Sequence, residues 1–258
     1  MMNNKKAKIV ISIIVAVVIT GTGIFYGVRQ MKLNEYKNTK IDLPKNFTIT
    51  AHTGCMNTEE NSIESMEKGI ENGAKIIEFD VRFLSDGTPI LAHDEPTGNE
   101  LKLKDAFEFL ANHKEIRANV DMKATDNMAM VQSLAEEYGV MDQIFFTGIG
   151  IDFVDAVKEG SPKIPYYLNV SVEKSKNTDK EYLLSIVEQV KNSGAIGINF
   201  NYKSASKELV DVFRENGLLV SIWTVDSEYN MYKILSFEPD NITTRKPDNL
   251  NEIVKKWK

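Results

Sequence analysis

The feature that most constrains the fold is a repeated alternation of β-prone segments with amphipathic, helix-like segments. Eight short β-prone segments occur along the chain, and helical patterns lie between most of them. Repeated βα units with short connections favour a parallel sheet, and eight of them favour a closed (β/α)₈ TIM barrel. The predicted strands are Thr48–Ala51, Lys75–Arg82, Ala118–Met122, Gln143–Thr147, Pro165–Asn169, Ile196–Phe200, Leu218–Thr224 and Asn241–Thr244.

Local signals add detail to the first two units. Asn61 is followed three residues later by Glu64, a spacing typical of a capping box that starts a helix, and Gly73 is a plausible stop for that helix. The turn Asp86-Gly87 leads into Pro89–Ala92, so we expect a hairpin at the barrel rim.

The N-terminal segment predicts a membrane anchor. Ile9 to Val28 carries no charge and is long enough to cross a bilayer as a helix. Three lysines at positions 5, 6 and 8 precede it, which favours a cytoplasmic N-terminus and places the predicted barrel outside the cytoplasm of a single-pass cell-membrane protein. Cleavage of this segment as a signal peptide is the alternative. The expected organisation is a cytoplasmic tail (1–8), an anchor (9–28), a tether (29–45) and a barrel (46–258).

Composition excludes some partners. The chain has 258 residues and a formal net charge of −6, which gives no indication of a nucleic-acid-binding surface. Its single cysteine, Cys55, excludes an intramolecular disulfide.

Three acidic residues lie where strands should be buried. Glu78 and Asp80 alternate along one predicted strand and therefore point to the same side, and Asp121 lies near the end of the next. Buried carboxylates are costly unless a cation or proton accompanies them. Three carboxylates without a cysteine favour a hard cation, Ca²⁺ or Mg²⁺. The alternative is a set of structural salt bridges with Lys123 and Arg82.

Two histidines are expected beside these acids. His52 follows the first predicted strand, and His93 ends the rim hairpin. Active sites of TIM barrels lie at the C-terminal ends of the strands, where His52, Asp80 and Asp121 fall. Two histidines beside a carboxylate pair favour acid–base catalysis over a structural role.

Several linked motifs resemble the glycerophosphodiester phosphodiesterase family. Their order and spacing together make a specific signal, although any one alone would be weak. The matching pieces are His52-Thr53-Gly54, Glu60-Asn61-Ser62, Gly73-Ala74, Ile77-Glu78-Phe79-Asp80-Val81, Asp86-Gly87 and His93-Asp94.

The resemblance implies site roles and shows departures. It assigns His52 and His93 as the acid–base pair. It also matches Trp223 to an aromatic position that could pack against the glycerol or alcohol part of a substrate. The alternative is that Trp223 only belongs to the apolar core of the barrel. Where the family usually has His-Arg-Gly, this chain has His52-Thr53-Gly54, so Thr53 could offer a substrate only its hydroxyl. Where the family usually has Glu-x-Lys, this chain has Asp121-x-Lys123, and where it has Thr-Asp-x-Pro, this chain has Thr244-Arg245-Lys246-Pro247.

Two further cations are candidate phosphate ligands. Lys123 lies two residues beyond Asp121 and could hold a phosphoryl oxygen or only neutralise the acids. Arg82 could take over part of the phosphate clamp that Thr53 cannot provide, or it could pair with a surface carboxylate such as Asp86.

The expected function is metal-dependent hydrolysis of a glycerol-containing phosphodiester, from a small molecule or a lipid, to an alcohol and a glycerol phosphate. The first alternative is a phospholipase-D-like or envelope-polymer phosphodiesterase on the same barrel. The second is a non-catalytic module that binds phosphodiesters.

Overall fold

The computed structural model describes residues 26–257, and the chain divides into two units between Lys40 and Ile41. In the first unit, residues 26–38 form a helix, so much of the predicted tether is helical. No helix within residues 26–257 is long and apolar enough to cross a membrane. The predicted anchor, residues 9–28, lies outside the described residues except for its last three positions.

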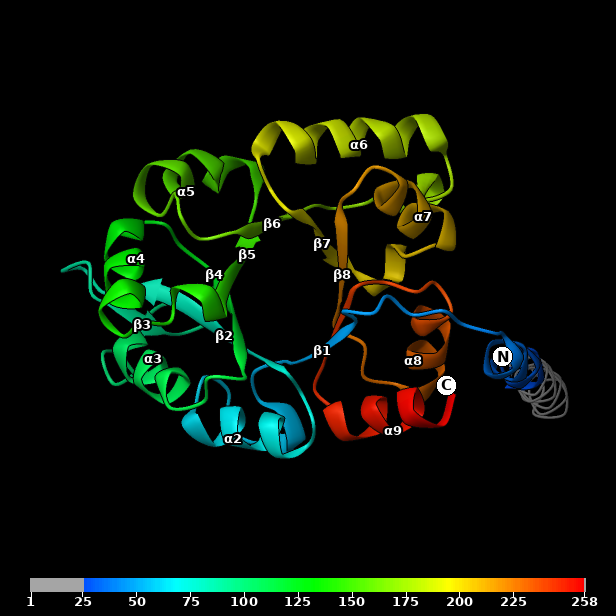
Figure 1. The fold of residues 1–258 in the computed structure, drawn as a ribbon, viewed down its shortest axis with the longest axis horizontal. Helices are drawn as coiled ribbons and strands as arrows, with labels where there is room; N and C mark the ends of the chain where they lie inside the picture. The colour runs from blue at the N-terminus through cyan, green and yellow to red at the C-terminus, as the bar shows by residue number, and fades with distance from the viewer. Residues whose placement is uncertain (1–25, 258) are drawn as a thin grey trace, which may run out of the picture. The chain divides into compact units, whose positions relative to one another are not determined.

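The second unit is a closed barrel of eight parallel strands, as predicted (Figure 1). Strands β1 and β9 pair with each other, and β1 also pairs with β2, which closes the ring. The short β3 adds to β2 in antiparallel fashion and forms the expected rim hairpin. The strands are β1 Thr48–Ala51, β2 Ile76–Phe83, β3 Pro89–Leu91, β4 Arg117–Met122, β5 Ile144–Ile149, β6 Tyr166–Asn169, β7 Gly197–Asn201, β8 Leu219–Trp223 and β9 Asn241–Thr244.

Helices surround this ring of strands (Figure 1). They follow the strands in alternation, and short 3-10 turns occur within the loops, among them η1 Cys55–Asn57 and η3 Ile151–Phe153. The helices are α2 Ile63–Glu71, α3 Leu103–Ala111, α4 Met128–Glu137, α5 Val154–Gly160, α6 Lys180–Ser193, α7 Lys207–Glu215, α8 Glu228–Leu235 and α9 Pro247–Trp257.

The start of α2 corrects one prediction. Ser62, not Asn61, is the N-cap, and its hydroxyl accepts a hydrogen bond from the Ser65 backbone N–H. Asn61 adopts a left-handed backbone conformation (φ 57°), which asparagine tolerates better than most residues. Its side chain is therefore free to point away from the helix, toward β2.

Strand β2 shows how the sequence separates the core from the site. Ile77, Phe79 and Val81 are fully buried and belong to the apolar core that holds the strands and helices together. The alternate residues Glu78 and Asp80 point into the barrel instead. Their carboxylates are almost completely buried, with 6% and 2% of the residue surface exposed.

Candidate active site

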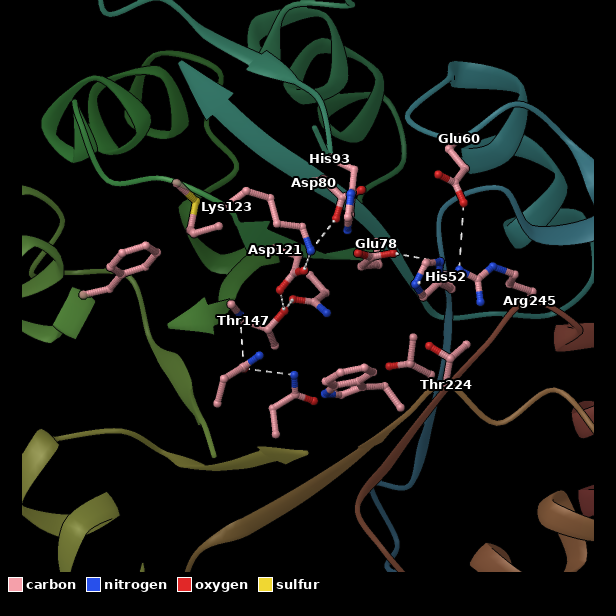
Figure 2. Close-up of a pocket in the computed structure, with 18 residues that line it drawn as sticks. His52, Glu60, Glu78, Asp80, His93, Asp121, Lys123, Thr147, Thr224 and Arg245 are labelled. Atoms are coloured by element: carbon pink, nitrogen blue, oxygen red, sulfur yellow. Dashed lines mark hydrogen bonds and ion pairs between the residues drawn. The ribbon is translucent and has the colours of Figure 1, made fainter. Parts of the chain in front are cut away.

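A cavity of about 630 Å³ opens among the strand ends and the loops that follow them (Figure 2). Seven of the nine residues predicted for the site line this cavity, and Thr53 and Arg82 do not. The seven are His52, Glu78, Asp80, His93, Asp121, Lys123 and Trp223.

The acidic residues converge as predicted. Asp80 on β2 and Asp121 on β4 are direct partners in the strand register, and Glu78 lies one pleat deeper on β2. One carboxylate oxygen from each lies within 4.8 Å of the other two. Lys123 reaches back over them, with its Nζ 3.0 Å from Asp80 Oδ1 and in contact with Asp121 Oδ2. Of the two salt-bridge partners considered for these acids, Lys123 is therefore paired with them in the structure.

Burial sets the electrostatics of this cluster. Desolvation raises the pKa of Glu78 to about 7, with the Asp80 and Asp121 carboxylates adding to the rise and His52 opposing it. Burial lowers the pKa of Lys123, but the carboxylates of Asp121 and Asp80 outweigh it and the pKa is raised overall. Lys123 is therefore a fixed positive charge, and two of the three carboxylate charges have no such partner.

Two side chains that were not among the predicted site residues orient the acids. Asn61 Nδ2 donates to Asp80 Oδ2 at 3.0 Å, while its Oδ1 accepts from the Asp80 backbone N–H at 2.9 Å. The Thr147 hydroxyl lies 2.7 Å from both Asp121 Oδ1 and Asn119 Oδ1. Asn61 was visible in the Glu60-Asn61-Ser62 motif, but its spacing to Glu64 indicated a helix cap.

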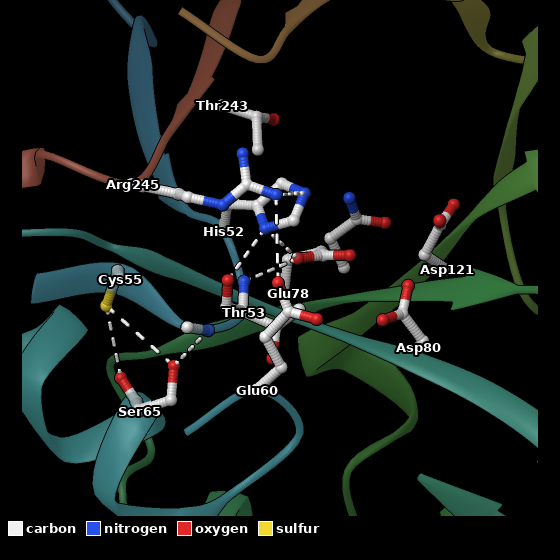
Figure 3. A network of polar contacts seen from close by, with 12 residues as sticks. His52, Thr53, Cys55, Glu60, Ser65, Glu78, Asp80, Asp121, Thr243 and Arg245 are labelled. Atoms are coloured by element: carbon white, nitrogen blue, oxygen red, sulfur yellow. Dashed lines mark hydrogen bonds and ion pairs between the residues drawn. The ribbon is translucent and has the colours of Figure 1, made fainter. Parts of the chain in front are cut away.

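His52 presents one nitrogen to the cavity. Its Nδ1 lies 2.8 Å from the Thr53 carbonyl oxygen, which can only accept, so Nδ1 carries the proton and Nε2 is left with its lone pair. Glu78 Oε2 lies 3.7 Å from the same Nδ1. Figure 3 shows His52 between Glu78 and Arg245. The imidazole is thus held in the tautomer that a general base requires.

His93 has a parallel arrangement in a more open setting. Its Nδ1 donates to Asp94 Oδ1 at 2.8 Å, and 60% of its side chain is exposed. Arg82 Nε donates to the His93 carbonyl oxygen at 2.9 Å, and Arg82 Nη1 pairs with Glu95 at 2.9 Å. The structure gives Arg82 partners outside the cavity, because at the end of β2 its side chain meets the loop that follows β3. It holds the His93 loop rather than facing the acids.

Thr53 has a different place from the one predicted. Its backbone N–H donates to Glu78 Oε2 at 2.7 Å, and its hydroxyl accepts from the Asn61 backbone N–H. The hydroxyl is therefore used to shape the loop and does not line the cavity. Thr53 acts on the site by orienting Glu78.

The opposite wall of the cavity is neutral. Asn199 Nδ2 donates to Asn169 Oδ1 at 3.0 Å, and Trp223 closes the wall at the end of β8. Asn199 Oδ1 and Trp223 Nε1 are buried polar atoms without a hydrogen-bond partner within residues 26–257. The predicted aromatic wall is present, together with amides that the sequence analysis missed.

The donor set fits a divalent cation. Three clustered carboxylates offer the hard oxygen ligands that Ca²⁺ and Mg²⁺ prefer. The single ammonium of Lys123 leaves two negative charges to compensate, and burial makes these charges costly. The acidic cluster could therefore hold a metal ion.

The fold and the cavity define a (β/α)₈ barrel enzyme with an acidic cluster between two histidines. The chain belongs to the glycerophosphoryl diester phosphodiesterase family, whose model matches residues 43–113 and 95–249. This finding confirms the resemblance seen in the linked motifs.

Individual relatives agree with this assignment. A glycerophosphodiester phosphodiesterase of Caldanaerobacter subterraneus subsp. tengcongensis is 25% identical over 81% of this chain and 98% of its own length. A putative glycerophosphoryl diester phosphodiesterase from Silicibacter pomeroyi has a similar structure, with TM-score 0.71, 15% identity, and coverage of 86% of this chain and 97% of that chain. An Oleispira antarctica phosphodiesterase, solved in complex with the product sn-glycerol-3-phosphate, has TM-score 0.68 and 16% identity over 83% of this chain and 97% of that chain.

Proposed function

We propose that this protein hydrolyses a glycerophosphodiester to an alcohol and a glycerol phosphate in a reaction that requires a divalent cation. The single observation that carries the proposal is the convergence of two histidines on a buried acidic cluster within one cavity. Family membership and the relatives named for this activity support it.

Glu78, Asp80 and Asp121 would hold the cation, either Ca²⁺ or Mg²⁺. When bound, such an ion neutralises charge on phosphoryl oxygens and lowers the pKa of a coordinated hydroxyl or water. Asn61 and Thr147 keep the Asp80 and Asp121 carboxylates oriented toward the centre of the cluster. Lys123 balances part of their charge and stands where it can also contact a phosphoryl oxygen.

The two histidines move protons. One imidazole accepts the proton of the attacking oxygen, which belongs to water or to a neighbouring glycerol hydroxyl, and the other donates a proton to the leaving alcohol. In both residues an oxygen acceptor holds Nδ1–H, so Nε2 is the nitrogen that faces the reaction. A substrate with a nitrophenol leaving group separates the two roles, because it needs no protonation and should rescue only the variant that lacks the acid.

The neutral wall suits the alcohol or glycerol portion of the substrate. Trp223 offers an apolar ring face, and its Nε1 is a donor without a partner in the described part of the chain. Asn199 Oδ1 is an acceptor that also has no hydrogen-bond partner within the described residues. A hydroxyl group both donates and accepts, so a glycerol moiety matches this pair.

The second candidate function is a phospholipase-D-like or envelope-polymer activity on the same barrel, and the observation that favours it is the predicted anchor at residues 9–28. We also propose that the barrel lies outside the cytoplasm of a single-pass membrane protein. This topology is supported by the uncharged segment and the lysines before it. Protease added to intact cells should then digest the barrel, and digestion only after lysis would contradict this topology.

Product analysis tests the activity. Full-length protein in detergent is incubated with glycerophosphoethanolamine, a lysophospholipid and polyglycerolphosphate, with and without Mg²⁺ or Ca²⁺, and phosphorus NMR identifies the products. The proposal expects sn-glycerol 3-phosphate from the first substrate only when the cation is present. A cyclic or lipid phosphate as the main product would favour the second function, and binding without turnover would indicate a non-catalytic module.

A further inference from the structure

Arg245 is a cavity residue for which the predicted site assigned no role. It follows β9 directly, as His52 follows β1, and these two strands are hydrogen-bonded neighbours. The His52 backbone N–H donates to the Thr244 carbonyl, and the Arg245 carbonyl accepts from the Met56 N–H at 3.0 Å. Closure of the barrel therefore fixes the two side chains beside each other at the rim.

The guanidinium of Arg245 is weakly engaged. Its Nη1 lies 3.4 Å from Asp226 Oδ2 and its Nη2 lies 3.8 Å from Glu60 Oε1, both beyond the usual range for a strong charged hydrogen bond. About 40% of the side chain is exposed, and it lines the cavity (Figure 2). Lys123, in contrast, is already shared by two carboxylates.

The distance to His52 decides what Arg245 can reach. Arg245 Nη2 lies 3.5 Å from His52 Nε2, the nitrogen that faces the reaction. An oxygen at hydrogen-bonding distance from Nε2, roughly 2.8 Å, can also lie within hydrogen-bonding distance of Nη2. In the proposed reaction that oxygen either attacks phosphorus or leaves it, so the phosphoryl group lies next to it and one of its oxygens comes within reach of the guanidinium.

We propose that Arg245 is the phosphate-binding arginine of this enzyme and contacts a non-bridging phosphoryl oxygen beside His52. The two other candidate substrate ligands near this place, Thr53 and Arg82, point elsewhere and leave it to Arg245. Glu60 and Asp226 keep the guanidinium at the rim without saturating its five donors. The inference deepens the proposed function and rests on it.

The test is calorimetric binding of sn-glycerol 3-phosphate to the full-length, metal-loaded protein, alongside kcat and KM for glycerophosphoethanolamine. Arg245→Gln should weaken binding by about tenfold to a hundredfold, the value of a charge-assisted hydrogen bond, and Arg245→Lys should weaken it less. The matched control is Arg214→Gln. Arg214 is also 40% exposed and also lies between two carboxylates, but it does not line the cavity, so wild-type binding is expected.

Glu60→Gln separates a phosphate contact from a structural ion pair. Removing this competing carboxylate should leave binding unchanged or tighten it if Arg245 holds the phosphate. The proposal is overturned if Arg245→Gln binds as wild type does, if Glu60→Gln weakens binding as much as Arg245→Gln, or if the wild-type protein does not bind the probe. Binding with no hydrolysis of any glycerophosphodiester would overturn the proposed activity instead and leave the role of Arg245 intact.

Discussion

The two halves of the barrel interior are built alike but differ in charge. The acidic half, formed by β1, β2, β4 and β9, carries His52, Glu78, Asp80, Asp121, Lys123 and Arg245 (Figure 2). The amide half, formed by β5 to β8, carries Thr147, Asn169, Asn199 and Trp223. Both halves consist of parallel strands of one sheet, and they differ in the residue types that line the cavity.

The comparison separates chemistry from recognition. In the amide half the hydrogen bonds join neutral groups, as when Asn199 Nδ2 and the Gly148 N–H both donate to Asn169 Oδ1. Within the described residues, Asn199 Oδ1 and Trp223 Nε1 are left there as neutral polar atoms without a partner. In the acidic half, internal pairing is incomplete, because Lys123 cannot balance three carboxylates. We therefore expect the cation and phosphoryl group on the acidic side and the hydroxyl groups of the substrate on the amide side.

Removal of the metal should have the largest effect, because it disables the acidic half as a whole. Chelation should abolish glycerophosphodiester hydrolysis, and Ca²⁺ or Mg²⁺ should restore it. The cation should also raise the melting temperature, since it binds the folded state. Full activity in protein shown to be metal-free by elemental analysis would contradict the assignment of the acidic cluster.

Loss of either histidine should come next. His52→Ala and His93→Ala should each lower kcat by a factor on the order of 10² or more, because each removes a proton-transfer group. Circular dichroism of the variants checks that the barrel still folds. Near-wild-type turnover in both would show that proton transfer takes place elsewhere.

The raised pKa of Glu78 should appear as a pH-dependent stability in metal-free protein. Burial raises the pKa of this carboxyl from 4.5 to about 7, so the folded state binds the proton more tightly than the unfolded state. The tighter proton binding stabilises the folded state fully below about pH 4.5, and this stabilisation is lost as the pH rises through 7. It amounts to a few kcal/mol of the free energy of unfolding at most.

The matched variant for this experiment is Glu78→Gln, which mimics the protonated side chain at every pH. Denaturant unfolding of the two metal-free proteins between pH 4.5 and 8 should show a free energy of unfolding that falls with pH more steeply in wild type than in Glu78→Gln. Equal slopes would mean that Glu78 is ionised in the folded protein without a cation.

The smallest effect is expected in the amide half. Asn199→Leu keeps the branched arrangement of the side chain but removes the free Oδ1 and the Nδ2 donor to Asn169, so KM for glycerophosphoethanolamine should rise by roughly threefold to tenfold with little change in kcat. A loss in kcat as large as that of His52→Ala would erase the distinction between the two halves.

The barrel and the acidic cluster could be predicted from the sequence for one physical reason. Charged residues in an otherwise apolar strand, such as Glu78 and Asp80, are too costly to be accidental, and alternation in a strand fixes their direction. The register of β2 against β4 then places Asp80 beside Asp121. Local pattern and fold class were sufficient for these positions.

Other positions depended on contacts that no local pattern contains. Asn61 had the spacing of a helix cap, yet its side chain crosses to Asp80, nineteen positions further along the chain. Arg82 was expected either at the cavity or beside a surface carboxylate such as Asp86, and it pairs with the exposed carboxylate of Glu95 and with the loop after β3. Arg245 meets His52 only because β9 closes the barrel against β1, and the amides of β6 and β7 do not stand out in sequence, where asparagine often marks a turn.

A crystal structure of the full-length His52→Ala variant with sn-glycerol 3-phosphate and Ca²⁺ tests the central claim most directly. The account predicts the ion among Glu78, Asp80 and Asp121, the phosphate beside it within reach of Arg245, and the glycerol hydroxyls toward Asn199 and Trp223. A phosphate seated against the amide half, or an ion bound away from the three carboxylates, would contradict the account.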